Sequence, residues 1–258
     1  MKNINGIELF LLDMDGTLYL GDEPLPGAPD AVMRIRLAHK KVCFLTNNSS
    51  KSRTDYVEKL NRLGFEAAID EVYTSGLACI EYLKKRYVNR SVYLLGTEAL
   101  REEFLLNGIK LTDGKPDIVV IGYDTGLTYA RLSRACVYIR DGAKYLATHS
   151  DLNCPAPGGY VPDTGSFIEL IKASTGRTPD IICGKPFNVM ASAIRAKYGA
   201  VPEKTAMVGD RLTTDLRFAK NNGYYSVLVL SEETDLKMLK KYPDKPDLVL
   251  NSIANLLV

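Results

Sequence analysis

The sequence predicts an α/β protein built on a parallel sheet. Strand-like apolar segments alternate with segments of helical spacing along the chain, which is the order typical of α/β folds. The run at residues 7–12 is almost entirely apolar, as in a strand that is buried on both faces. It leads into Asp13 and Asp15, and open α/β sheets hold their ligands at the carboxyl ends of their strands.

In the N-terminal and C-terminal parts of the chain, the spacing of apolar residues and the glycines that end helices predict the elements. A helix is expected over residues 27–39, a strand over residues 41–46, and a second helix over residues 54–63 that ends at Gly64. Toward the other end we expect strands at residues 205–209, 225–230 and 247–250, and a helix at residues 213–222.

The middle of the chain has an alternation of its own and lacks acidic strand ends. We expect strands at residues 91–95, 117–121 and 144–148, with helices at residues 98–106 and 128–140. We interpret this block as a second domain inserted into the first, with hinges near residues 80 and 180. A single continuous sheet is the alternative.

Composition excludes several classes of protein. A chain of 258 residues suffices for one large or two ordinary domains, and a net charge of +2 gives no reason to expect nucleic acid or an anionic membrane as a partner. No stretch of about 18 apolar residues occurs, so we expect no membrane span and no secretory signal. Five widely spaced cysteines without a C-x-x-C motif indicate a reducing cytoplasm, with Cys43 and Cys183 as buried thiols.

The pair of acids after the first strand predicts a metal-dependent phosphoryl-transfer site. Asp13 and Asp15 lie one residue apart and need a positive partner, for which a hard divalent cation is the usual choice. Gly16 allows a sharp turn. An EF-hand loop is excluded because the glycine is fourth rather than sixth and the twelfth position is Pro24.

Three further strand ends carry polar groups that suit phosphate. Thr46-Asn47-Asn48-Ser49 offers hydroxyl and amide groups, Gly184-Lys185-Pro186 offers a cation, and the stretch from Gly209 to Asp215 adds Asp210 and Asp215. Each has an ordinary alternative: a turn with an N-cap, an exposed lysine, or an acid that complements a helix dipole. For each motif taken singly, the ordinary alternative is favoured. The occurrence of all three motifs at the ends of apolar strands, however, indicates one shared site.

With these motifs the sequence resembles the haloacid dehalogenase superfamily. The matching motifs are Asp13-x-Asp15-Gly16-Thr17, Thr46, Lys185 and Gly209-Asp210-x-x-x-x-Asp215. The wider pattern is similar to the NagD-like branch, the p-nitrophenyl phosphatase-type enzymes. That resemblance implies a Rossmann-like core domain of residues 1–80 and 181–258, with an inserted α/β cap domain of residues 81–180.

The resemblance also implies roles for individual residues. Asp13 would be the nucleophile, forming an aspartyl-phosphate, and Asp15 the general acid and base. The group implied to bind phosphoryl oxygens comprises Thr46, Asn47, Asn48 and Lys185.

The cofactor implied by the resemblance is Mg²⁺. Its ligands would be the Asp13 carboxylate, the Asp15 backbone carbonyl and Asp210. Asp215 would support the site by orienting Lys185 or the metal-bound water.

Two positions depart from the pattern of the branch. His149 stands where asparagine is more usual, and Asp163 lies in a stretch that commonly has glycine. His149 is expected either to contact the substrate or to be a loop histidine whose ring is hydrogen-bonded to the backbone. Asp163 is expected to be structural.

The main functional hypothesis is a cytoplasmic Mg²⁺-dependent phosphatase for small phosphate monoesters, such as sugar phosphates or nucleoside monophosphates. The alternative enzyme is a phosphotransferase or phosphomutase that uses the same aspartate, and a non-enzymatic binding protein is a third hypothesis. Dehalogenation is disfavoured, because those relatives lack the second aspartate that is present here as Asp15. We expect a monomer or a homodimer formed through the cap.

Overall fold

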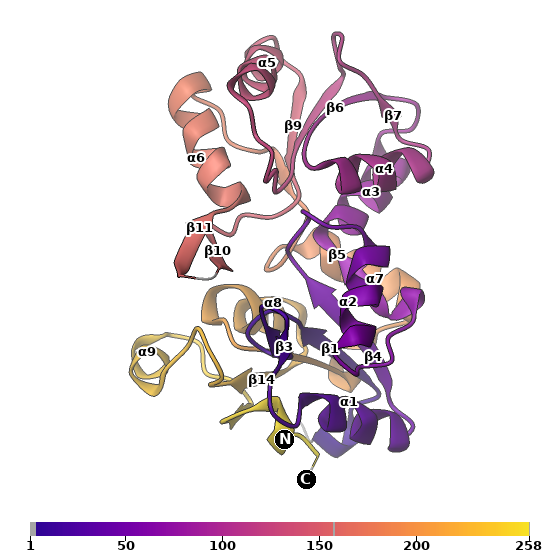
Figure 1. The fold of residues 1–258 in the computed structure, drawn as a ribbon, viewed down its shortest axis with the longest axis vertical. Helices are drawn as coiled ribbons and strands as arrows, with labels where there is room; N and C mark the ends of the chain where they lie inside the picture. Colours follow the sequence, from indigo (N-terminus) through magenta and orange to yellow (C-terminus); the bar gives the residue numbers. More distant parts are fainter. Residues whose placement is uncertain (1–3, 157, 258) are drawn as a thin grey trace. The chain divides into compact units, whose positions relative to one another are not determined.

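The chain forms two compact units in the computed structural model, which describes residues 4–156 and 158–257. Unit 1 comprises the chain up to Thr46, the segment Arg53–Tyr73 and the chain from Lys185 onward. Unit 2 comprises Asn47–Ser52 and Thr74–Gly184. Figure 1 shows that both units contain a sheet flanked by helices. The α/β class predicted from the sequence is therefore confirmed.

Unit 1 is built on a six-stranded sheet with the order β15-β14-β13-β1-β4-β5. β1 lies between β4 and β13 and runs parallel to both, as β14 does to β13 and to β15. A small hairpin of β2 and β3 follows β1. The strands are β1 (Leu9–Asp13), β2 (Tyr19–Leu20), β3 (Glu23–Pro24), β4 (Lys41–Thr46), β5 (Val72–Thr74), β13 (Thr205–Gly209), β14 (Tyr225–Val229) and β15 (Leu248–Leu250).

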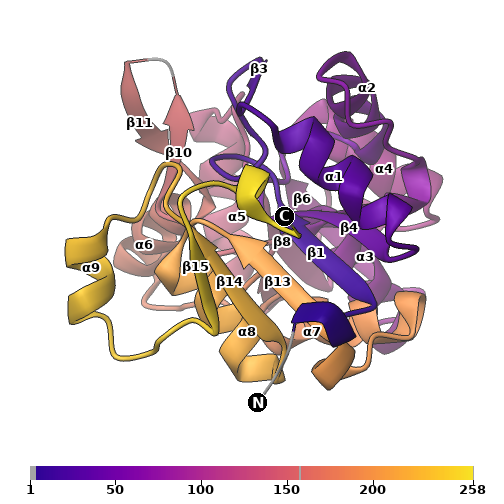
Figure 2. The same cartoon turned by 90° about the horizontal axis from the view of Figure 1, so that it is seen from below.

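Helices cover both faces of this sheet. α1 and α2 lie on one side of it, and α7 and α8 lie on the other (Figure 2). The core on the α1 side joins alternate residues of β1 and β4, such as Phe10 and Phe44, to Val32 and Ile35 of α1. The helices are α1 (Ala28–Leu37), α2 (Arg53–Arg62), α7 (Asn188–Tyr198), α8 (Arg217–Asn222) and α9 (Leu236–Lys241), with short 3-10 turns η1 (Ile4–Gly6), η2 (Ile69–Glu71), η3 (Pro202–Lys204) and η5 (Ile253–Asn255).

The helix expected over residues 213–222 is divided in two. A π-helical turn, η4 (Leu212–Leu216), precedes α8. The N–H of Leu216 donates to the carbonyl of Arg211, five residues back, at 3.1 Å. This wider turn inserts one residue into the helix, as is frequent at functional sites, and the pattern of apolar residues does not reveal it.

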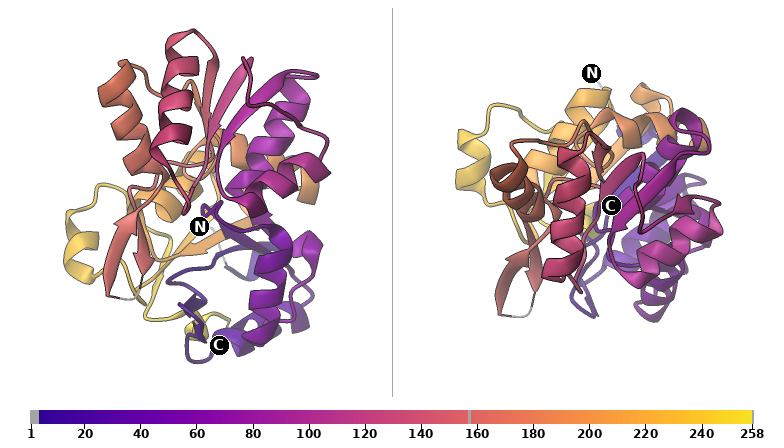
Figure 3. Two further views of the ribbon diagram at one scale, coloured as in Figure 1. Left: turned by 45° about the horizontal axis from the view of Figure 1, so that its top comes forward. Right: turned by 90° about the horizontal axis from the view of Figure 1, so that it is seen from above.

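Unit 2 has a parallel five-stranded sheet with the order β12-β9-β8-β6-β7. α5 and α6 pack on one face of it, and α3 and α4 lie on the other (Figure 3). An antiparallel pair, β10 and β11, precedes α6. The elements are α3 (Ser75–Arg86), β6 (Ser91–Leu95), α4 (Glu98–Leu106), β7 (Lys110–Leu111), β8 (Ile118–Ile121), α5 (Tyr129–Arg140), β9 (Lys144–Ala147), β10 (Asn153–Ala156), β11 (Gly159–Pro162), α6 (Thr164–Thr175) and β12 (Ile181–Ile182).

The last strand of unit 2 lies beyond the boundary that the sequence suggested at residue 181. Ile181 and Ile182 pair with Leu146 and Ala147 of β9, so this strand joins the second sheet. A strand of two residues carries too little pattern to indicate which sheet it joins. Among the described residues, no helix has the length and apolar character needed to cross a membrane.

Candidate active site

The carboxyl edge of the sheet in unit 1 collects polar residues from three neighbouring strands. Asp13 is the last residue of β1, Thr46 is the last residue of β4, and Asp210 follows β13 directly. Parallel pairing brings these strand ends to one edge, where ligands of open α/β sheets bind. All three residues are buried, so their polar groups lie in surroundings of low dielectric constant.

The turn after β1 requires glycine at position 16. The N–H of Leu18 donates to the carbonyl of Met14 at 2.8 Å, which closes the turn. Gly16 has a φ of +85°, a left-handed conformation that costs other residues energy. A Cβ atom on Gly16 would also lie only 2.4 Å from Oδ2 of Asp210. The absence of a side chain therefore allows Asp210 to approach the loop that carries Asp13.

Lys185 forms the positive centre of the cluster. Its side chain is almost fully buried, and Nζ donates to Asp13 Oδ1 at 2.5 Å and to Asp215 Oδ1 at 2.7 Å. Burial by itself would lower the pKa of Lys185, but the two neighbouring carboxylates raise it above its ordinary value. The lysine therefore stays charged and holds both acids in place.

The two acids that follow β13 have raised pKa values. Burial and the charge of Asp13 raise the pKa of Asp215 to about 6, although Lys185 opposes the shift. Burial, Asp13 and Asp215 raise the pKa of Asp210 well above its usual range. The N–H of Arg211 donates to Asp215 Oδ2 at 3.2 Å, and a backbone N–H after β14 donates to Asp210. Burial and repulsion between the carboxylates thus outweigh the nearby positive charges of Lys185 and Arg211 in their effect on these pKa values.

The side chains present fit a hard divalent cation such as Mg²⁺. One carboxylate oxygen from each of Asp13, Asp210 and Asp215 lies within 4.8 Å of the other two. Lys185 forms ion pairs with Asp13 and Asp215, and oxygen ligands are those that Mg²⁺ prefers. The group includes Asp215, which the sequence suggested only as a supporting residue. The expected ligand from Asp15 is its backbone carbonyl, and this contact stays a prediction.

Asp15 lies in the same loop, with its carboxylate outside this group of three acids. The hydroxyl of Tyr19 donates to Asp15 Oδ2 at 3.4 Å. Burial, which is the largest influence, and the charge of Asp13 raise the pKa of Asp15, whereas Lys59 lowers it. Nζ of Lys59 lies 3.9 Å from the centre of the Tyr19 ring. Asp15 therefore accepts a hydrogen bond from a neutral donor and is also affected by the charges of Lys59 and Arg211.

Two contacts of the cluster were not anticipated from the sequence. Oγ1 of Thr17 lies 3.4 Å from Asp13 Oδ2 and 3.5 Å from Asp210 Oδ1, so one hydroxyl links the two acids. The backbone N–H of Glu233 donates to Asp210 at 3.1 Å. Thr17 belongs to the motif Asp13-x-Asp15-Gly16-Thr17, so the sequence contains a signal for its place in the site. Glu233 has no sequence signal, because only the fold brings its backbone to this site.

Asn47 and Asn48, expected to bind phosphate, belong to unit 2. Nδ2 of Asn47 donates to the carboxylate of Asp151, at 3.2 and 3.1 Å to its two oxygens. Oδ1 of Asn48 accepts hydrogen bonds from the N–H of Ser50 at 2.9 Å and from its hydroxyl at 2.7 Å. Both side chains thus help to shape the loop after β4, and their contact with phosphate stays a prediction.

His149 is fully buried in unit 2, with partners at both ring nitrogens. Nε2 lies 2.9 Å from Asp163 Oδ1, and Nδ1 lies 3.0 Å from Thr148 Oγ1. Asp163 in turn accepts from the N–H of Thr164 at the start of α6. These contacts favour an internal role for His149, with the side chains of Asp163 and Thr148 as partners of its ring. A contact between His149 and a substrate stays a prediction.

Comparison with known sequences identifies relatives that cover almost the whole chain. The profile of the haloacid dehalogenase-like hydrolases matches residues 10–110, and a HAD-hydrolase-like profile matches residues 182–256. A 4-nitrophenylphosphatase of Schizosaccharomyces pombe is 33% identical, covering 98% of this chain and 94% of the relative. A dihydroxyacetone phosphatase of Corynebacterium glutamicum is 34% identical, covering 96% and 90%.

Solved structures agree with this assignment. A 4-nitrophenylphosphatase of Thermotoga maritima superposes with a TM-score of 0.94 at 45% identity, covering 97% of this chain and 96% of that one. NagD of Escherichia coli K-12 superposes with a TM-score of 0.89 at 28% identity, covering 96% and 98%. With the carboxylate cluster at the edge of a parallel sheet, these likenesses lead to one conclusion. The chain belongs to the haloacid dehalogenase-like hydrolases, in their NagD-like branch of phosphoric monoester hydrolases.

Proposed function

We propose that this protein hydrolyses small phosphate monoesters through a covalent intermediate on Asp13, with Mg²⁺ as cofactor. The observation that carries the proposal is the contact of Lys185 with Asp13 at 2.5 Å inside a cluster of three buried acids. The ammonium group of this buried lysine holds the Asp13 carboxylate in place for attack on phosphorus. It also offsets negative charge when a phosphoryl group arrives.

The proposed chemistry has two displacement steps. A carboxylate oxygen of Asp13 attacks phosphorus, and the bond from phosphorus to the ester oxygen breaks as Asp15 gives that oxygen a proton. Asp15 then takes a proton from a water molecule, whose oxygen attacks the phosphorus of the aspartyl-phosphate. The bond from phosphorus to the Asp13 oxygen breaks, which restores the carboxylate and releases inorganic phosphate. Thr46, at the end of β4, is proposed to donate to a phosphoryl oxygen, and Lys185 stabilises charge on the transferring group.

The metal is assigned to the same edge of the sheet. The proposed ligands are the Asp13 carboxylate, the Asp15 backbone carbonyl and Asp210, and Asp215 orients Lys185 through the contact at 2.7 Å. When bound, Mg²⁺ would neutralise charge on the phosphoryl oxygens and on the acids around it.

The names of relatives support a substrate class. Relatives include an acid sugar phosphatase of Staphylococcus epidermidis, a 5′-nucleotidase of Bacillus subtilis and a glycerol-3-phosphate phosphatase of Mus musculus. We therefore propose small sugar, polyol or nucleoside phosphates as substrates. These names also favour hydrolysis over transfer of the phosphoryl group to a second substrate.

The two units receive different roles in this proposal. Asp13, Asp15, Thr46, Lys185 and Asp210 all belong to unit 1, so unit 1 is proposed as the catalytic core and unit 2 as the cap that selects the substrate. All five cysteines are free thiols, which supports a reducing compartment such as the cytoplasm. A monomer or a homodimer formed through unit 2 is the proposed state.

The direct test is phosphate release from a panel of phosphate monoesters, measured with Mg²⁺ and with excess EDTA. We expect release that depends on Mg²⁺ and is restored when the metal is returned. Equal release in EDTA would contradict the metal assignment. Transfer of phosphate to an added sugar, without release, would instead identify a phosphotransferase.

Asp13→Asn tests the nucleophile. An amide cannot accept the phosphoryl group, so turnover of p-nitrophenyl phosphate should fall by at least about 10³-fold, while the circular dichroism spectrum is unchanged. Asp22→Asn, at an exposed position of unit 1, is the control and should retain full activity. Turnover of the Asp13 variant at the wild-type rate would refute covalent catalysis by this residue.

A further inference from the structure

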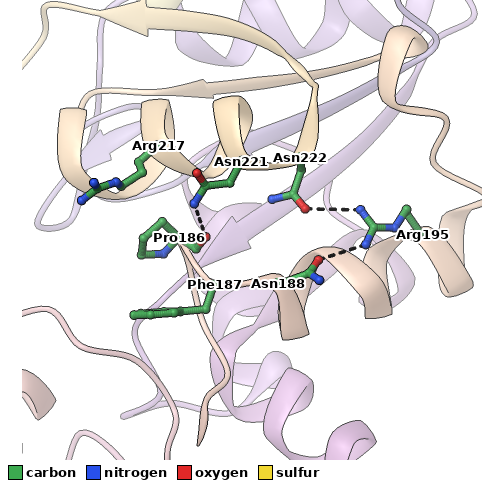
Figure 4. A pocket seen from close by; sticks show the side chains of 7 residues that line it. All are labelled: Pro186, Phe187, Asn188, Arg195, Arg217, Asn221 and Asn222. Atoms are coloured by element: carbon green, nitrogen blue, oxygen red, sulfur yellow. Dashed lines mark hydrogen bonds between the residues drawn. The ribbon is translucent and has the colours of Figure 1, made fainter. Parts of the chain in front are cut away.

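A pocket lies in unit 1 beside the segment that follows Lys185. It has a volume of about 700 Å³ and is open to solvent, and its floor is formed by Pro186, Phe187 and Asn188 (Figure 4). The amide of Asn221 on α8 donates to the carbonyl of Pro186 at 3.2 Å. An occupant would therefore touch the chain next to Lys185 without entering the carboxylate cluster.

The charge of this pocket is positive. Its lining includes Arg195 of α7 and Arg217 of α8 and, among the described residues, no carboxylate. The two helices themselves contain no acidic residue, and their other cations, Lys197 and Lys220, are paired with Asp70 at 4.0 Å and Asp247 at 3.4 Å. Both guanidinium groups are always protonated, so the pocket favours an anionic ligand.

The two arginines differ in how much they are already engaged. Arg195 donates to Asn222 Oδ1 at 3.3 Å and to Asn188 Oδ1 at 3.0 Å, so neutral side chains hold its guanidinium in place. In the described part of the chain, no hydrogen bond or ion pair of Arg217 is found, and the residue is exposed. Arg195 therefore offers a fixed cation, and Arg217 offers one with all its donors available.

The spacing of the two cations indicates the shape of the ligand. Arg217 is the first residue of α8, whereas Asn222, which Arg195 contacts, is the last. The guanidinium groups lie at opposite ends of the pocket, as Figure 4 shows. A ligand that reaches both cations therefore needs an acidic group at each end, with a carbon chain between them. The 39% exposed ring of Phe187 offers apolar surface to that chain.

We propose that this pocket binds a small organic anion with two acidic groups, one at Arg195 and the other at Arg217, as a site separate from the carboxylate cluster. Each contact would be a charge-assisted hydrogen bond of the kind that guanidinium forms with phosphate or carboxylate. The proposal does not depend on the phosphatase chemistry, which phosphate release and Asp13→Asn test on their own.

The test uses butane-1,4-diylbisphosphonate and butylphosphonate in isothermal titration calorimetry of the full chain. Both are free of hydrolysable ester bonds, and one phosphonate group of either can enter the catalytic site. We expect the bisphosphonate to bind wild-type protein at two sites and butylphosphonate to bind at one. A single site for both compounds would overturn the proposal.

Arg217→Gln identifies the second site. Because Arg217 has no partner to lose among the residues that the structure describes, the variant should fold normally, and its affinity for the bisphosphonate at the second site should fall by about tenfold or more. Arg195→Gln should have the same effect, and Arg62→Gln, which changes an exposed arginine of α2, should have none. A second site that keeps its affinity in both pocket variants would refute the assignment.

Discussion

A single lysine side chain provides the charge balance of the carboxylate cluster. Lys185 is 1% exposed and lies between Asp13 and Asp215. Buried charges are tolerated only when they are paired, and removal of one partner leaves the others uncompensated. The cluster should therefore be as sensitive to the loss of its cation as to the loss of an acid.

Lys185→Met is expected to lower the free energy of unfolding in EDTA at pH 8 by about 3–5 kcal/mol. The methionine has a similar length but leaves the buried carboxylates without their positive partner. Urea denaturation measures the change. The double variant Lys185→Met, Asp215→Asn removes one of the stranded charges and should recover part of the loss. A single variant as stable as the wild type would show that the ion pairs contribute nothing to the fold.

Asp163 has two functions at the start of α6. Its carboxylate accepts from the N–H of Thr164 and contacts the buried ring of His149. Burial alone would raise the pKa of Asp163, but the His149 ring and the hydrogen bonds from Thr164 lower it below its ordinary value. The ionised carboxylate is therefore favoured in the folded state.

Asp163→Ala should destabilise unit 2 by about 2–4 kcal/mol, because it removes a helix cap and leaves a buried ring nitrogen without its partner. Asp163→Asn keeps an acceptor oxygen and should lose less. The stabilisation from the lowered pKa is fully present above the unfolded-state pKa of about 3.9 and is lost as the pH falls through the folded-state value. Thermal unfolding between pH 3 and pH 7 tests this, and a difference between wild type and Asp163→Ala that does not shrink below pH 4 would contradict it.

The loop after β1 combines two requirements in one element. It must turn through a left-handed residue, and it must let Asp210 from the neighbouring strand end come close. Gly16 meets both requirements, with a φ of +85° and a built Cβ only 2.4 Å from Asp210. Gly21, in the turn between β2 and β3, meets only the first, since its φ is +56° and nothing lies within 4 Å of its Cβ position.

These two glycines form a matched pair of substitutions. Gly16→Ala and Gly21→Ala should each cost about 1 kcal/mol of stability for the left-handed backbone. Only Gly16→Ala should also displace Asp210 and weaken Mg²⁺ binding, by about tenfold or more, since one carboxylate ligand is moved. Unfolding experiments and titration with Mg²⁺ separate the two effects. Equal affinity for Mg²⁺ in both variants would show that the close approach of Asp210 to Gly16 has no effect on metal binding.

At the scale of the whole molecule, the proposed metal site would couple Mg²⁺ binding to folding. Asp13, Asp210 and Asp215 come from segments far apart in the sequence, and their oxygens meet only in the folded chain. The unfolded chain has no such site, so a ligand of the cluster stabilises the folded state by mass action.

Mg²⁺ at about 100 times its dissociation constant should stabilise the protein by about 2.7 kcal/mol. The measurement is the melting temperature with MgCl₂ and with NaCl at the same ionic strength. In Asp210→Asn the shift should be reduced, because one proposed ligand has lost its charge. A melting temperature that MgCl₂ leaves unchanged in the wild type would contradict metal binding at this cluster.

Regular elements of both units were predictable because they carry strong local patterns. The expected strands at residues 41–46, 91–95 and 205–209 and the helix at residues 98–106 agree with β4, β6, β13 and α4 residue by residue. The π-helical turn before α8 and the sheet to which β12 belongs were not predictable. Both depend on hydrogen bonds between particular backbone groups, which leave no periodic trace in the side chains.

The sequence by itself determined the α/β class, the family, and the acids and lysine that stand at strand ends, because apolar runs and the residues that follow them are local features. Only the tertiary structure decided that Lys185 contacts both Asp13 and Asp215, that Asp215 joins the acidic cluster, and that His149 is enclosed with Asp163. These contacts join residues from separate elements of the chain. Their distances and pKa shifts follow from packing and burial, which exist only once the sheets have formed.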